Sequence, residues 1–238
     1  MRKITSIEIH PDNSQEIIPN FTDEFPYRCS RAEINRYSGK FVPWHWHNAV
    51  ELFYIESGEL EYITPNASMI FPAGTGGFVN SGILHMTRPR ANSNETVQLL
   101  HLFDPVLISG SQGGRIAEKY VIPMLTSGCE IIPIGEDNQL LDTLQKSFLL
   151  DEHERGFELH IRSLLSYIWL QIESIAAGQR KDFAMIKAND KLKHMMDMYI
   201  NIIRNESTYP ILPKLFIPAS GSVIACSMIC CIVLRWNI

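Results

Sequence analysis

The sequence predicts a mainly β domain, built as a sandwich or small barrel and followed by a pair of α-helices. Up to residue 135, Pro, Gly, Asn and Ser divide the chain into short β-branched and aromatic runs, which are typical of closely spaced strands. After residue 136 the apolar spacing changes to that of amphipathic helices. With 238 residues, 45% of them hydrophobic, the chain can form one large globular domain or two small ones.

The first part of the chain contains the expected strands. They are ITSIEI, FVPWHWHNAVELFYI, LEYIT, SMIFPA, GGFVN, VQLLHLF and CEIIPI. Gly58 follows the longest run and is expected to let the chain reverse, so that Leu60 and Tyr62 return in the neighbouring strand.

Two amphipathic helices are expected next, over residues 137–150 and 157–175. The first places Leu140, Leu141, Leu144 and Phe148 on one face. The apolar stripe of the second consists of Phe157, Ile161, Leu164, Leu165, Ile168, Ile172 and Ile175. This stripe is either the face that covers the β domain or a dimerisation face, and the sequence leaves both open. Gly178 is the expected C-cap.

Charge and cysteine content exclude several classes of protein. A net charge of -5 argues against a surface built mainly to hold polyanions. The five cysteines show no spacing that suggests a disulfide framework or a zinc knuckle. No apolar segment follows the first basic residues, so we expect no secretory signal and a cytoplasmic location.

Metal-type and ligand-type side chains concentrate in PWHWHNAVELFYIESGEL, residues 43–60. On a single strand His45, His47, Glu51 and Phe53 would project to one face, because side chains alternate along a strand. His85, after a Pro- and Gly-rich run, is a further candidate.

The spacing His45-x-His47-x3-Glu51-x6-Gly58, with His85 downstream, resembles the two cupin motifs. It implies a small β-barrel of the double-stranded β-helix type. Three interpretations of the four polar residues remain open. They could bind a divalent metal such as Fe, Mn, Ni or Zn. They could line a pocket for a small ligand, or they could be polar groups satisfied by backbone and water.

The order of elements, with HWHNAVEL in the barrel and DKLKHMMDMYINII after the helices, resembles regulators of the AraC family. The resemblance implies a cupin sensor over 1–135, a helical pair over 136–178 that is a candidate for dimerisation, a linker over 179–190, and the first helix of a truncated DNA-binding domain over 191–206. It also implies a small-molecule effector such as a sugar or sugar acid, a homodimer, and DNA binding only in an intact full-length form. The expected ligand-binding residues are His45, His47, Glu51, Phe53, Tyr62 and His85.

Residues 207–238 depart from the family pattern with an apolar, Cys-rich tail. From Pro218 onward, codon degeneracy in a shifted reading frame permits an Arg-x-Phe and a Ser-Pro-x-x-Tyr, as in the DNA-binding domain of the family. We therefore expect a frameshift between about Asn205 and Pro218. The alternative is a C-terminal membrane anchor, since no charge lies between Lys214 and Arg235.

The sequence contains no nucleophile motif, phosphate loop or dinucleotide fingerprint. We therefore expect a sensor with no catalytic residue and no cofactor. The alternative is a metal-dependent cupin enzyme, an oxygenase or isomerase, with His45, His47, Glu51 and His85 holding a divalent transition metal.

Overall fold

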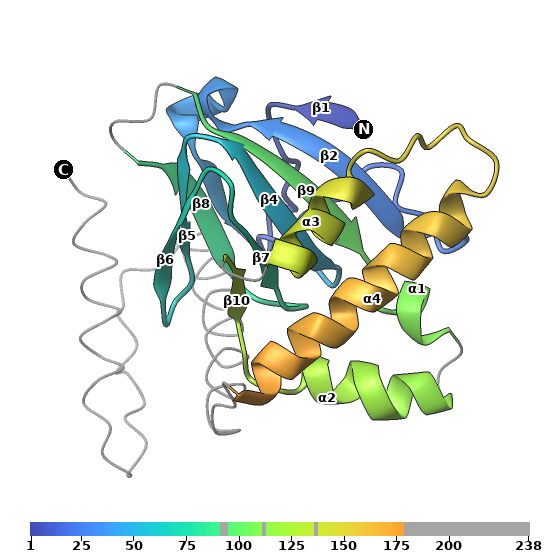
Figure 1. Ribbon diagram of the computed structural model, residues 1–238. Helices are drawn as coiled ribbons and strands as arrows, with labels where there is room; N and C mark the ends of the chain where they lie inside the picture. The colour runs from blue at the N-terminus through green and yellow to red at the C-terminus, as the bar shows by residue number, and fades with distance from the viewer. Residues whose placement is uncertain (91–94, 111–112, 136–137, 179–238) are drawn as a thin grey trace, which may run out of the picture. The chain divides into compact units, whose positions relative to one another are not determined.

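The computed structural model describes residues 1–90, 95–110, 113–135 and 138–178. Within these ranges two β-sheets form the body of the domain, with strand orders β1-β2-β9-β4-β7-β10 and β3-β8-β5-β6 (Figure 1). The larger sheet contains β1 (Arg2–Ile4), β2 (Tyr27–Glu33), β4 (Val50–Ser57), β7 (Gly76–Val79), β9 (Val97–Phe103) and β10 (Ile131–Ile134). The smaller contains β3 (Val42–His45), β5 (Glu59–Ile63), β6 (Ser68–Pro72) and β8 (His85–Pro89).

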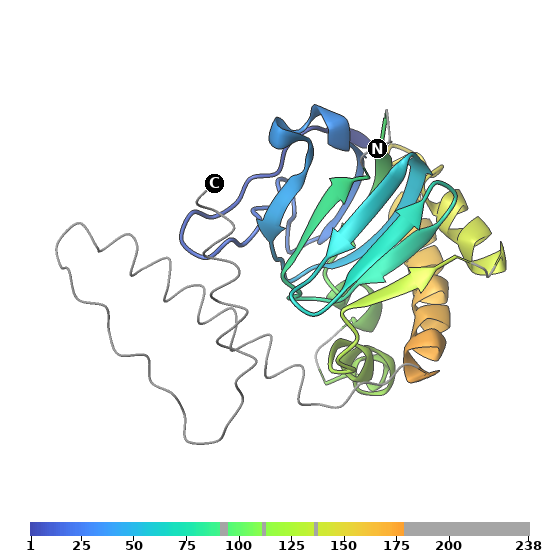
Figure 2. The same ribbon diagram turned by 90° about the vertical axis from the view of Figure 1, so that its left-hand side faces the viewer.

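The chain crosses repeatedly between the two sheets. From β6 to β9, each strand belongs to the sheet opposite the one before it. Figure 2 views the barrel from the side of the smaller sheet. The predicted mainly β, cupin-type barrel is therefore confirmed.

The expected reversal at Gly58 differs from a simple hairpin. Gly58 does adopt a left-handed conformation, with φ 76°. However, β4 pairs with β7 and β9, whereas β5 pairs with β6 and β8. The turn therefore carries the chain to the opposite sheet, and the prediction that Leu60 and Tyr62 return beside β4 was wrong.

The long run around His45 is likewise two strands rather than one. β3 ends at His45 in the smaller sheet and β4 begins at Val50 in the larger one. The single-strand argument was therefore wrong, although its conclusion that the polar side chains converge holds. Strands β2 and β8 were not predicted, because YRCSRAE and HMTRP are too polar to show an apolar alternation.

Alternation within the central strands separates two apolar clusters. On β4, Val50 and Leu52 belong to a cluster shared with the helices, while Phe53 and Ile55 belong to the cluster inside the barrel. This period of two is what a strand buried on both faces requires. Glu51 shares the inner face of β4 with Phe53 and Ile55, so its side chain points into the barrel.

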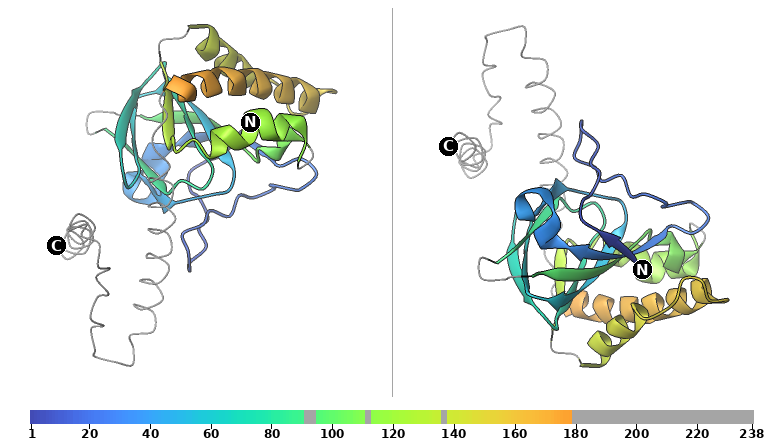
Figure 3. Two further views of the ribbon diagram at one scale, coloured as in Figure 1. Left: turned by 90° about the horizontal axis from the view of Figure 1, so that it is seen from below. Right: turned by 90° about the horizontal axis from the view of Figure 1, so that it is seen from above.

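Two longer helices, α3 (Asn138–Ser147) and α4 (Phe157–Gly178), lie together along one side of the barrel (Figure 3). Both predicted helices are confirmed, and Gly156, with φ 94°, directly precedes α4. Of the α4 stripe, Phe157, Ile161, Leu165, Ile168 and Ile172 are buried in the cluster shared with the larger sheet. The stripe is therefore the face that covers the barrel.

Shorter helical segments complete the described part of the chain. They are η1 (Ile34–Arg36), η2 (Ser38–Lys40), α1 (Val106–Ser109), the π-helical η3 (Ala117–Val121) and α2 (Ile122–Leu125). No helix in the described ranges is both long and apolar enough to cross a bilayer. The predicted linker, DNA-binding helix and tail lie outside these ranges.

Candidate functional site

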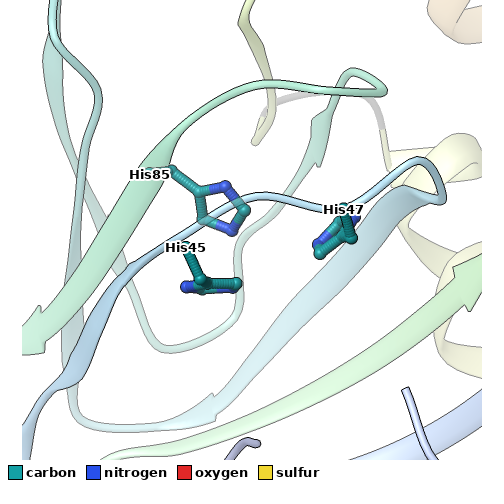
Figure 4. A group of neighbouring side chains, drawn as sticks. All are labelled: His45, His47 and His85. Carbon is teal, nitrogen blue, oxygen red and sulfur yellow. The ribbon is translucent and has the colours of Figure 1, made fainter. Parts of the chain in front are cut away.

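Three histidines converge inside the barrel. His45, at the end of β3, and His85, at the start of β8, are direct partners in the antiparallel pairing of these strands. His47 comes from the segment that leads from β3 to β4. Figure 4 shows the three imidazole rings turned toward a common space. The ring centroids of His45 and His85 are 4.3 Å apart, and His47 lies 5.8 Å and 5.4 Å from them, respectively.

Each ring is held in the same way by the backbone two residues away. The distances from Nδ1 to the carbonyl oxygen are 2.8 Å for His45 and Pro43, and 2.8 Å for His47 and Ala49. His85 does the same with Ile83 at 2.9 Å. Because a carbonyl oxygen only accepts, each Nδ1 must carry a proton, and in the neutral ring the lone pair then lies on Nε2. The cluster therefore presents three Nε2 atoms as potential metal ligands.

Glu51 supplies a carboxylate to this cluster from the inner face of β4. Its Oε2 lies 3.6 Å from Nε2 of His47 and 3.5 Å from Nε2 of His85. Its other oxygen, Oε1, accepts hydrogen bonds from the Tyr62 hydroxyl and, at 3.0 Å, from the Gln98 amide. Tyr62 and Gln98 thus fix the carboxylate so that Oε2 faces the histidines.

A second carboxylate was missed by the sequence analysis. Glu16 belongs to the N-terminal segment that precedes β2, and its side chain is only 8% exposed. Its Oε2 lies 3.9 Å from Nε2 of His45 and 4.0 Å from Nε2 of His47. Neither a motif nor an apolar alternation surrounds Glu16 in the sequence, so only the fold brings it to the cluster.

Burial and mutual charge determine the protonation of the cluster. Burial, reinforced by the two other histidines, holds the pKa of His45 well below its usual range. Burial alone would raise the pKa of Glu51, but the imidazoles of His47 and His85 outweigh it and hold that pKa well below its usual range. Burial raises the pKa of Glu16. Glu51 is therefore the anion at the centre of the cluster.

A cavity of about 60 Å³ adjoins the cluster. His45, His85, Glu51, Glu16 and Gln98 line it, as do Arg28 and Thr87. The buried hydroxyl of Thr87 has no hydrogen-bond partner among the described residues. A buried polar group without a partner is costly, so this hydroxyl is available to a bound ligand.

The structure places the other predicted ligand residues behind the cluster. Tyr62 is fully buried and acts on Glu51 through its hydroxyl. Phe53 stacks on Tyr62 with 4.2 Å between ring centroids, and it is not among the residues that line the cavity. We therefore assign Phe53 to packing and Tyr62 to the positioning of Glu51.

The donor set fits a divalent transition metal. Ligand atoms about 2.1 Å from one ion are separated from each other by roughly 3.0 to 4.2 Å. The distances from Glu51 Oε2 to the nearest Nε2 atoms fall in this interval, and the histidine ligand atoms all lie within 4.8 Å of one another. Nε2 of His47 is buried without a hydrogen-bond partner in the described structure, so its lone pair is available to a ligand.

Fold and cluster together define a cupin-type barrel with a cluster of three histidines and a glutamate. No protein-family profile matches the chain. The chain is 24% identical over 194 residues to YdeC of Bacillus subtilis (strain 168), described as an uncharacterized HTH-type transcriptional regulator, where HTH stands for helix-turn-helix. The alignment covers 78% of this chain and 64% of YdeC, so the chain spans less than two thirds of that relative's length.

The comparison with solved structures returned the following two proteins among others. ToxT from Vibrio cholerae is 13% identical, with 63% of this chain and 56% of ToxT covered and a TM-score of 0.44. A cupin-2 domain containing protein from Shewanella frigidimarina is 16% identical, with 34% and 71% covered and a TM-score of 0.26. The resemblance recognised in the sequence is confirmed: this chain is similar to HTH-type transcriptional regulators, and its described part has the cupin fold.

Proposed function

We propose that the described part of this chain is the sensing domain of a helix-turn-helix transcription regulator, and that His45, His47, His85 and Glu51 hold a divalent transition metal in it. The observation that carries the metal proposal is the common orientation of the three Nε2 atoms, each fixed by a backbone carbonyl. The sequence favoured a sensor without a cofactor, whereas this geometry supports the alternative that the four residues hold a metal. When bound, the metal would act as a Lewis acid for an oxygen ligand.

The size and lining of the cavity limit the effector. A buried water needs roughly 10–15 Å³ of such space, so a cavity of about 60 Å³ holds only a few water-sized groups. The lining offers a guanidinium from Arg28 and a free hydroxyl from Thr87. These groups suit a small hydroxy or keto acid better than a whole sugar. The proposed effector is therefore the metal with a small anionic oxygen ligand.

Sensing requires that the effector binds two arrangements of the regulator with different affinity. In the proposed mechanism, the chain's own residues hold the effector between the two sheets, and the helices packed on the larger sheet transmit the change. DNA binding belongs to the intact regulator. A homodimer would use the outer face of α4, where Leu159, Tyr167 and Leu170 are exposed.

The same donor set also favours one other function, a metal-dependent cupin enzyme. In that case the cavity beside the cluster would bind a substrate that is oxidised or isomerised. Turnover of small hydroxy or keto acids by the metal-loaded chain distinguishes this alternative from a sensor.

Thermal unfolding with added metal tests the proposed function. At a free metal concentration of 100 times Kd, binding stabilises the folded state by about 2.7 kcal/mol, which raises Tm by roughly 5 to 10 °C for a domain of this size. We expect Zn²⁺, Ni²⁺ or Mn²⁺ to produce this rise, and Mg²⁺ to produce much less, because imidazole ligands disfavour it. A wild-type chain that responds to none of these metals would reject the metal centre.

A further inference from the structure

The N-terminal segment carries a carboxylate into the proposed metal centre. We propose that Glu16 is a further ligand of the metal, so that binding of a divalent cation locks residues 8–17 over the mouth of the barrel. This inference rests on the proposed metal centre of His45, His47, His85 and Glu51. It adds a metal ligand that lies outside the barrel strands. Hydrogen–deuterium exchange of the segment that carries this ligand would then report whether the metal is bound.

The distances support a shared ion. Oε2 of Glu16 lies 3.9 Å from Nε2 of His45 and 4.0 Å from Nε2 of His47. Both separations fall within the roughly 3.0 to 4.2 Å expected between ligand atoms of one metal. They are also too long for hydrogen bonds, so Glu16 lies close to the imidazoles without being bonded to them.

The two carboxylates approach the histidines from different elements. Glu51, on β4, faces His47 and His85, whereas Glu16 faces His45 and His47. His47 is therefore common to both, and its Nε2 is the buried atom that lacks a hydrogen-bond partner in the described structure. A cation placed among these groups would satisfy that atom and both carboxylates.

Charge gives an independent reason for a divalent ion. Two carboxylates held together in a buried space repel each other, and an isolated buried charge is strongly unfavourable. A divalent cation placed among them would balance both carboxylates. Arg28, which also lines the cavity, donates hydrogen bonds to Ser30 and to the carbonyl of Pro19, and its positive charge also acts on Glu16.

Backbone hydrogen bonds hold Glu16 in place beside β3. The Glu16 N–H donates to the carbonyl of Trp46 at 2.8 Å, and the Trp46 N–H donates to the carbonyl of Ser14 at 3.1 Å. The indole of Trp46 donates to the carbonyl of Asn13 at 2.8 Å. Trp46 lies between the ligands His45 and His47 in the sequence. A metal held by those histidines and by Glu16 would therefore link the N-terminal segment to the end of β3.

Metal titration combined with hydrogen–deuterium exchange tests the inference on the full 238-residue chain. The probe is Zn²⁺ added to metal-free protein. Glu16→Gln removes the charge at constant shape, and Glu24→Gln, an exposed residue of the same N-terminal segment, is the matched control. We expect at least a 10-fold loss of Zn²⁺ affinity in Glu16→Gln. Zn²⁺ should slow exchange of residues 8–17 in the wild type and in Glu24→Gln, but not in Glu16→Gln.

The outcomes separate the inference from the proposed function. Unchanged affinity and unchanged protection in Glu16→Gln, with affinity lost in Glu51→Gln, would overturn the role of Glu16 and leave the barrel centre intact. A wild-type chain that binds no Zn²⁺ would overturn both.

Discussion

Tyr62 and Glu51 are joined inside the barrel by a hydrogen bond from the tyrosine hydroxyl to Oε1 of the carboxylate. Tyr62 comes from β5 of the smaller sheet and Glu51 from β4 of the larger one. The bond therefore spans the barrel and turns Oε2 toward the histidines. Such supporting contacts determine how well a carboxylate serves as a metal ligand.

Removal of this hydroxyl in Tyr62→Phe is expected to weaken Zn²⁺ binding by about 10- to 100-fold. Glu51 would keep only the amide of Gln98 on Oε1, so its orientation would loosen. Tyr54→Phe is the control, since the Tyr54 hydroxyl accepts a hydrogen bond from Gln145 outside the cavity. Calorimetric titration measures both affinities. Equal affinity in Tyr62→Phe and wild type would show that the hydroxyl does not support the site.

Stability at acidic pH is expected to depend on His101, which is fully buried. Its ring nitrogens contact the Tyr27 hydroxyl and the Ser147 hydroxyl, each at 2.8 Å. Burial lowers the pKa of His101 to about 3, so the folded state keeps it neutral while the unfolded chain protonates it. The stabilisation is complete above the ordinary pKa of about 6.5 and is lost as the pH falls toward 3.

From pH 7 to pH 5 this one residue should remove about 2 kcal/mol of unfolding free energy. Denaturant unfolding of wild type and His101→Leu at both pH values measures the effect. The variant is expected to be less stable at pH 7 but to lose less on acidification. Parallel losses in the two proteins would contradict a neutral buried His101.

The packing of α4 on the barrel predicts a large effect for Trp169→Ala. Trp169 is 2% exposed, lies edge-on to Phe78 with 5.7 Å between ring centroids, and donates its indole N–H to the carbonyl of Tyr120 at 2.9 Å. Truncation should cost about 3–5 kcal/mol of unfolding free energy. Leu170→Ala on the same helix, 47% exposed, should cost much less. Similar losses in both variants would place the packed face of α4 elsewhere.

The outer face of α4 is expected to mediate the proposed homodimer. Leu159 and Leu170 are exposed large apolar side chains on this helix, and charged residues would disfavour their burial against a second copy. The double variant Leu159→Glu/Leu170→Glu should therefore be monomeric in light scattering at concentrations where the wild type is dimeric. A variant that keeps the dimer mass would exclude this face.

Much of the fold follows from local patterns. The mostly apolar run VQLLHLF and the helical stripe of 157–175 lie where the structure has β9 and α4, respectively. The polar β2 and β8 were missed because their inward residues line a cavity rather than an apolar core. The opposite sheet buries these inward residues, and a contact between distant segments leaves no local pattern in the sequence.

The site was predictable where its residues share a motif. His45, His47, Glu51 and His85 do converge, as the spacing suggested. Glu16, Gln98 and Thr87 were missed because single polar residues on separate elements show no signal until the sheets bring them together. Phe53 was predicted to bind ligand because it shares a strand face with Glu51. Its side chain does point into the barrel, but there it packs against Tyr62 and the apolar cluster.

The metal content of the purified chain tests the central claim most directly. Elemental analysis of the wild type should find about one transition metal ion per chain, held by three imidazoles and a carboxylate. His153→Ala, which changes an exposed histidine, should retain it, and His47→Ala should lose it. Absence of stoichiometric metal in the wild type after growth and dialysis with Zn²⁺, or equal metal in His47→Ala, would contradict the account.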